Sequence, residues 1–280
     1  MGQLVSLSRN RYKIREGRNI SCVFENVSKC RMKKDLDELS VDITKVLQSS
    51  DLKDLSVDVA EMTLDSITDN ALLREIPIVK TLLSIIEVTQ NISNYLFLKK
   101  IVAFLNNIKG VSVRKRKQMI AKIDNSGEYK TKVGEALLGL LDKCEDTEKA
   151  SYLGTWFAAF LRGKISYGMF LCGAHIIERV FLPDLQYFIM QDEDWMMVED
   201  AAEEIAAGLF YIDFTTAFWD IRDVAVGKKD PKNVGDAGAK ITPVGIALRE
   251  VFNRYYKGPD YYPDPMLDGL FRRFRAPREE

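Results

Sequence analysis

The sequence predicts a mainly α protein, in which a multi-helix bundle is followed by a small α+β module. From about Met32 to residue 190, apolar residues recur at the three- and four-residue spacing of one helix face. After Trp195 the sequence turns to aromatic and β-branched residues, which favour strands, and then to a loop rich in Gly, Asp and Lys. The apolar share of 46% and the charged share of 29% are typical of a globular domain.

The first 31 residues differ from the rest of the chain. Residues 1–31 are rich in Lys and Arg and show no sustained apolar period, so we expect a flexible basic arm or an upstream extension. The compact bundle is then expected over residues 32–190. The four cysteines form no CxxC pair, which argues against a zinc ribbon and a disulfide framework and favours a cytoplasmic protein.

Glu75–Lys100 is the most apolar passage of the chain, and its first part, Ile76–Val88, poses a choice between a membrane and a protein core. Pro77 suits the first turn of a helix, so a helix is expected to begin near Ile76. This first part contains Lys80 and Glu87, and its thirteen residues fall short of the roughly 20 that a spanning helix needs. We therefore expect the central, buried helix of the bundle. A membrane-directed effector that acts through this helix remains an alternative.

The helices that follow are predicted from their end signals. Tyr95–Ile108 shows one apolar face, Gly110 ends it, and Ser112 can cap the next helix. That next helix begins with the basic run Arg114–Lys117, which either contacts phosphates or is a solvated first turn.

Three more helices complete the predicted bundle. Gly154 and Ala158 lie four residues apart, a spacing that lets a neighbouring helix approach closely. Pro183 marks the boundary after them. The three helices are expected over Val133–Cys144, from a cap at Asp146 or Thr147 to Gly163, and from Ser166 to Phe181.

The module is expected over residues 191–257. A helix over the acidic segment Asp192–Glu204 should run directly into a strand at Leu209–Trp219. A polar loop, a short strand, a turn at Thr242–Gly245 and a helix should follow. Residues 258–280 have no period and are expected to form a mobile tail.

This order of elements resembles the second half of a winged-helix domain. In that family the last wing strand often ends in a Leu-Thr-x-x-Gly sequence, and Ile241, Thr242 and Gly245 occupy those positions here. A DNA-binding regulator is therefore one alternative. The helix before the wing carries no Lys or Arg, however, and an acidic surface repels phosphate, so nucleic acid is not the expected partner. The acids are Asp192, Glu193, Asp194, Glu199, Asp200, Glu203 and Glu204.

A second resemblance covers about residues 95–190. The run EKASYLGTWFAAFLRGKISYGMFLCGAHIIERVF resembles the helical TerB-like domains of bacteria, and the wider arrangement is similar to abortive-infection-type proteins. Gly163, Ile165 and Ser166 match the turn of that family, which implies a helical fold and a role in stress or phage defence. Arg162 and Met169 stand where the family has acids, so its metal-binding carboxylates are not carried over and no metal is expected.

Candidates for chemistry are few. The single histidine, His175, lies three residues after Cys172, so the pair could form half of a metal site or a thiol–imidazole pair, but a packed helix is the favoured interpretation because no second ligand pair appears. The pairs Glu199/Glu203 and Asp200/Glu204 could hold a cation, although a solvated first turn is more common. No glycine-rich phosphate loop is present. We therefore predict no catalytic, cofactor-binding or metal-binding residue.

These observations predict a non-enzymatic interaction, scaffold or sensor component of a bacterial stress or phage-defence system. Its partner should be a protein, which includes a second copy of the chain. The residues expected to contact the partner lie in the acidic segment and in the wing loop: Asp192, Glu193, Asp194, Glu199, Asp200, Glu203, Lys228, Lys229 and Lys232.

Overall fold

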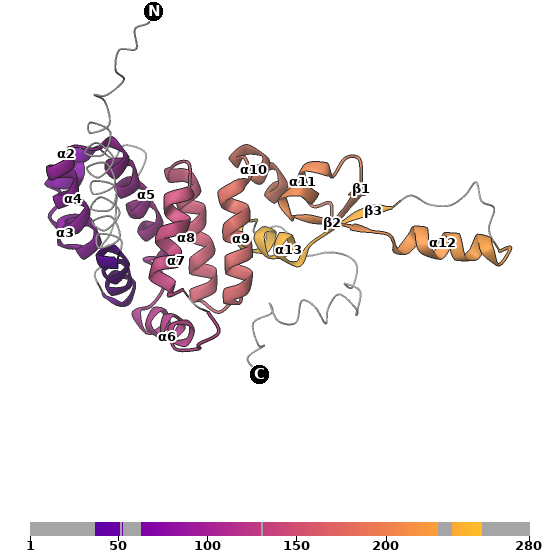
Figure 1. The fold of residues 1–280 in the computed structure, drawn as a ribbon, viewed down its shortest axis with the longest axis horizontal. Coiled ribbons are helices and arrows are strands. Elements are labelled where there is room, and N and C mark those ends of the chain that lie inside the picture. Colours follow the sequence, from indigo (N-terminus) through magenta and orange to yellow (C-terminus); the bar gives the residue numbers. More distant parts are fainter. Residues whose placement is uncertain (1–36, 51, 53–62, 130, 229–236, 254–280) are drawn as a thin grey trace, which may run out of the picture.

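The computed structural model describes residues 37–50, 52, 63–129, 131–228 and 237–253, and the fold is mainly helical, as predicted (Figure 1). The predicted arm, tail and Lys229 and Lys232 lie outside these residues. We call residues 37–190 the helical body. Its helices cover residues 37–48, α2 (Leu64–Asp69), α3 (Ala71–Glu75), α4 (Pro77–Thr89), α5 (Ile92–Ile108), α6 (Val113–Asp124), α7 (Val133–Lys143), α8 (Thr147–Leu161), α9 (Tyr167–Arg179) and α10 (Leu182–Met190).

The helix starts follow the local signals in the sequence. Pro77 occupies the first turn of α4, where a missing N–H costs no helical hydrogen bond. The side chains of Ser112, Asp146 and Ser166 each accept a hydrogen bond from a backbone N–H three residues later, and thereby cap α6, α8 and α9. These boundaries were predicted from the sequence and are confirmed.

The core of the body is built on the contact between α5 and α8. A Cβ at position 154 would lie 2.6 Å from the carbonyl oxygen of Phe104, so only glycine allows the two backbones to approach this closely. The expected close approach at Gly154 is therefore confirmed. Trp156 of α8 is fully buried, and its indole N–H donates to the carbonyl of Phe170 over 2.9 Å, which fixes α8 against α9.

The helix predicted over Ile76–Val88 is present as α4, but it is not the central helix. It lies at one end of the body, buries one face and leaves Lys80, Glu87 and Val88 exposed (Figure 1). The central position belongs to α8, which packs against α5, α6, α9 and α13. The passage is apolar enough to line a core on one side, yet its charged residues keep the other side in water. Among the described residues, no helix is long and apolar enough to cross a membrane.

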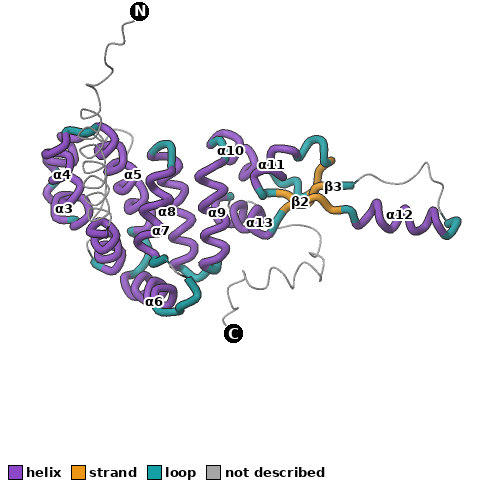
Figure 2. Tube along the Cα trace, in the orientation of Figure 1, coloured by secondary structure: helices purple, strands orange, loops and turns teal. Residues whose placement is uncertain are grey.

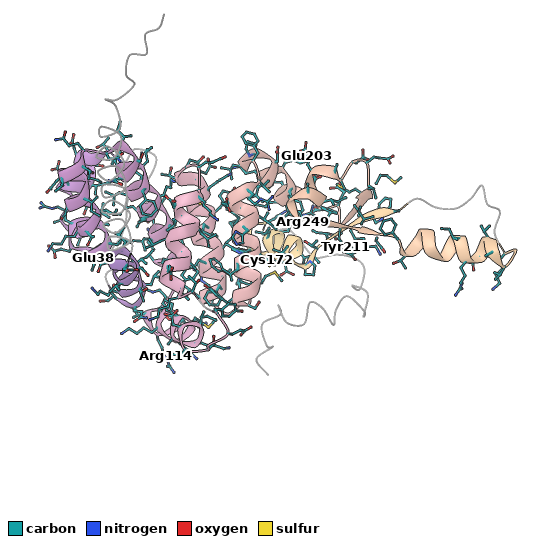
Figure 3. All side chains as sticks on the ribbon, in the orientation of Figure 1. Glu38, Arg114, Cys172, Glu203, Tyr211 and Arg249 are labelled. Carbon is teal, nitrogen blue, oxygen red and sulfur yellow. The ribbon has the colours of Figure 1, made fainter. Side chains whose placement is uncertain are left out.

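Arg114, Lys115 and Lys117 are exposed, as expected for a solvated first turn, but Arg116 is an exception. Its side chain is fully buried, and its guanidinium donates to the carbonyls of Leu47 over 3.0 Å and Ser49 over 2.8 Å. These carbonyls lie at the end of helix 37–48, where helical partners run out. Arg116 therefore ties α6 to that helix, while Arg114 is exposed on α6 (Figure 3).

We call residues 191–253 the sheet module. Its strands β1 (Trp195–Met197), β2 (Phe210–Asp213) and β3 (Gly238–Ile241) form an antiparallel sheet in the order β1-β3-β2. Its helices are α11 (Ala202–Ala207), α12 (Thr215–Ala225) and α13 (Pro243–Phe252). Thr242 caps α13 through Gly245, and α13 packs on α8, α9 and α10. Figure 2 shows the small sheet between α13 and α12.

Two predicted elements of the module are wrong. The strand expected over Leu209–Trp219 ends at Asp213, and α12 follows, because the Asp213 carboxylate accepts the backbone N–H of Thr215 over 2.9 Å and starts a helix there. A helix does run directly into a strand, as α11 and β2, but the helix does not extend over the whole acidic segment Asp192–Glu204. Residues 195–197 pair with β3 instead, a turn spans 198–200, and α11 contains only Glu203 and Glu204 of the acids. Pairing with a distant strand overrides the local helical pattern.

Candidate docking site

One long segment of the chain carries acidic side chains and no Lys or Arg. Between Val180 and Gly208 the chain has eight Asp and Glu residues and no Lys or Arg. The structure spreads these acids over α10, the loop before β1, the turn after it and the first turn of α11. Asp184, Asp192, Glu193, Glu199, Asp200 and Glu203 are exposed.

A cleft of about 340 Å³ lies within this acidic region, between α9, α10 and α11. We call it the α10–α11 cleft. Its apolar lining includes Ile176, Val180, Phe188 and Leu209. Its polar lining combines an imidazole and a guanidinium from α9 with three carboxylates from α10 and α11: His175, Arg179, Asp184, Glu203 and Glu204.

The cleft is held in place by Arg249 of α13. This buried side chain donates from Nε to the carbonyl of Phe188 over 3.0 Å and from Nη1 to the carbonyl of Glu193 over 2.9 Å. Nη1 also lies 3.3 Å from the Asp194 carboxylate, and the guanidinium stacks 4.4 Å from the centre of the Phe188 ring. Arg249 therefore closes the end of α10 and fixes the loop that leads into β1.

The structure describes seven of the nine predicted partner-binding residues and separates them from one another. Of these residues, only Glu203 lines the α10–α11 cleft. Asp194 forms an ion pair with Arg249 and thereby stabilises the fold. Lys228 is exposed beyond α12, at the end of the molecule. Figure 3 places Glu203 near the top of the module, away from Arg114 on α6. Asp192, Glu193, Glu199 and Asp200 surround β1 without lining the cleft.

Cys172 and His175 lie on α9, three residues apart, as the sequence implies. His175 is 56% exposed, and its Nδ1 lies 3.6 Å from the Glu178 carboxylate. Desolvation raises the pKa of the Cys172 thiol, the opposite of what an activated nucleophile needs. No group of three or more metal-binding side chains occurs among the described residues.

Sequence reasoning missed the basic half of the cleft. Arg179 ends a helix that precedes the acidic segment, and nothing in its local pattern links it to Glu203. The absence of Lys and Arg over 180–208 was the available signal, because it marks Arg179 as the last cation before a long acidic stretch. Comparison with known proteins adds no further residue: no family model matches the chain, and neither a characterised protein nor a solved structure similar to it was found.

Proposed function

We propose that this protein is a non-enzymatic interaction module that binds a basic segment of a partner protein at the α10–α11 cleft. The observation that carries the proposal is a cleft whose apolar lining is bordered by three carboxylates, next to a chain segment that has no Lys or Arg over 29 residues. An apolar side chain of the partner would fill the cleft, and Lys or Arg on either side of it would meet the surrounding carboxylates.

The two parts of this surface contribute differently. Burial of one large apolar side chain supplies about 1.5–3 kcal/mol, which makes the cleft the main source of affinity. Exposed ion pairs supply about 0–1 kcal/mol each, so the acids mainly select basic partners and speed their association. The same acids repel phosphate, which favours a protein partner over a nucleic acid. The proposed setting in bacterial stress or phage defence rests on the TerB-like resemblance alone.

The proposal is tested with two synthetic peptides of the same length, in which one Phe lies between Lys-rich or between Glu-rich flanks. Fluorescence anisotropy should show binding of the Lys-rich peptide only, weakening as salt rises. The double substitution E203K/E204K reverses two charges at the cleft and should weaken binding at least tenfold. The matched control E87K reverses an exposed charge on α4, at the other end of the molecule, and should leave binding unchanged.

Two results would overturn the proposal. Equal binding of the Lys-rich and Glu-rich peptides would show that the acidic surface does not select its partner. Equal losses in E203K/E204K and in E87K would show a non-specific effect of net charge, with no role for the cleft.

A further inference from the structure

The kind of segment that the α10–α11 cleft is proposed to bind occurs in this chain itself. Residues 270–275 read LFRRFR, which combines three apolar residues with three arginines and places Phe274 between two arginines. The nearest acids in the sequence are Asp268 and Glu279, so the six residues contain no carboxylate. The segment belongs to residues 254–280, outside the described part of the chain.

The cleft offers the surfaces that such a segment needs. Its lining holds three carboxylates and one guanidinium, that of Arg179, so acidic side chains outnumber this cation. Phe181 in the lining is 64% exposed and presents an aromatic ring to a bound segment. The ring of Phe274 would fill the apolar part of the cleft, and the neighbouring arginines would meet its carboxylates.

The segment leaves the described fold beside the cleft. Asn253, the last described residue, donates from its side-chain amide to the carbonyl of Ile189 over 3.0 Å. Ile189 follows Phe188, a cleft residue, on α10. Helix α10 has nine residues and is about 14 Å long, whereas residues 254–269 span up to about 50 Å when extended. Residues 270–275 can therefore reach the cleft of their own chain.

One other aromatic residue of the chain lies between two cations, namely Tyr12 between Arg11 and Lys13. It fits the cleft less well, because burial of its hydroxyl costs free energy unless a hydrogen bond replaces water. Its segment also enters the described fold through helix 37–48, at the opposite end of the helical body from α10 (Figure 1).

We propose that residues 270–275 occupy the α10–α11 cleft of their own chain, with Phe274 in its apolar part. The contact, which rests on the proposed function, adds a step of regulation, because a partner protein must displace the segment. A ligand linked to its site has an effective concentration in the millimolar range. With a dissociation constant of about 0.1 mM, the segment would fill the cleft in about nine of ten molecules and weaken binding of a partner about tenfold.

Three variants of the full chain test the contact. R272E/R273E reverses two charges of the segment, and Phe274→Ser removes its ring without a change in charge. The control R9E/R11E alters the net charge as much as R272E/R273E does, but in the first basic segment. In fluorescence anisotropy, R272E/R273E and Phe274→Ser should bind the Lys-rich peptide about five- to tenfold more tightly than the wild-type protein. R9E/R11E should bind it as the wild-type protein does.

A labelled peptide with the sequence of residues 266–278 tests the contact without the Lys-rich peptide. It should bind R272E/R273E, whose cleft is empty, and addition of E203K/E204K to that variant should weaken its binding at least tenfold. Sedimentation velocity should give the wild-type protein and R272E/R273E the same mass at every concentration, because the contact lies within one chain.

Four results are decisive. Equal binding of the Lys-rich peptide by the wild-type protein, R272E/R273E and Phe274→Ser would overturn the contact and leave the proposed function in place. An equal gain in R9E/R11E would overturn it too, because net charge or the first basic segment would be responsible. A wild-type dimer that R272E/R273E dissociates would place the segment on a second copy and overturn the contact within one chain. Failure of the Lys-rich peptide to bind any variant would overturn the proposed function, whereas failure of the 266–278 peptide to bind R272E/R273E would overturn the contact.

Discussion

The helical body and the sheet module each contain one buried arginine that closes the end of a helix, but the two side chains work in different surroundings. Arg116 reaches carbonyls of residues 47 and 49, about 70 positions earlier in the chain, and joins two helices of a large apolar core. Arg249 combines carbonyls with the Asp194 carboxylate and the face of Phe188. In the module, the contacts of Arg249 hold the elements together, whereas in the body apolar packing does so.

This difference reflects how much apolar surface each region can bury. Helices α5 and α8 are almost fully buried along one face, whereas β1, β2 and α11 are short and partly exposed. A region with few buried apolar contacts opens more easily. We therefore expect the module to depend on single polar contacts and the body to depend on the volume of its core.

The largest effect is expected from Trp156→Ala. Trp156 packs against Gly173 and lies 6.5 Å from the ring of Phe252 on α13, so its loss leaves a cavity where body and module meet. Loss of such a side chain costs about 3–5 kcal/mol, and urea unfolding should show one shifted transition. Tyr187→Ala, at an exposed position on α10, should change little. Two separate transitions in the variant would show that body and module unfold independently.

A smaller effect, confined to one region, is expected from Arg249→Met. The buried carbonyl of Phe188 loses a donor, which costs about 1–3 kcal/mol, while the part-buried carbonyl of Glu193 loses a donor that water can replace. Hydrogen exchange should rise in residues 188–213 and stay unchanged in α5 and α8. Arg116→Met is the matched change in the body, and exchange should rise in helix 37–48. If hydrogen exchange rose throughout the molecule in both variants, the claim that each arginine stabilises its own region would be wrong.

The smallest effect is expected from Asp213→Asn. Partial burial raises the pKa of this carboxyl, but bonds from Lys240 and Thr215 outweigh it, and the pKa lies below its usual value. The ionised group therefore stabilises the fold above about pH 4, its unfolded pKa, and this contribution is lost as the pH falls through the lowered folded value. Thermal unfolding should place the variant less than about 1 kcal/mol below the wild-type protein at pH 7, with the gap closing in acid. A gap that widened in acid would contradict this.

The body could be predicted from sequence because its boundaries are local. Pro77, Ser112, Asp146 and Ser166 act within one turn of their own helix. Helical periodicity does not show how many sides of a helix are covered, which is why α4 was placed at the centre.

The module could not be predicted in the same way, because its elements depend on partners far along the chain. Trp195 pairs with Lys240, and a Cβ at Gly238 would collide with the indole of Trp195, so β1 forms only where that glycine meets it. The candidate site also depends on residues that lie far apart in the sequence. Glu203 could be identified from its charge, but the cleft that it lines needs Arg179 and Asp184 from two other helices.

The strand order β1-β3-β2 sets the sequence of events during synthesis. Within the part of the chain that the structure describes, each outer strand pairs only with β3, so neither has a strand partner there until residues 238–241 have been translated. The helices up to α9 can pack on one another before then, since domains generally fold as units while the chain grows. A released chain that ends shortly before residue 238 would therefore carry a folded body next to two unpaired strands, and unpaired strand edges favour aggregation.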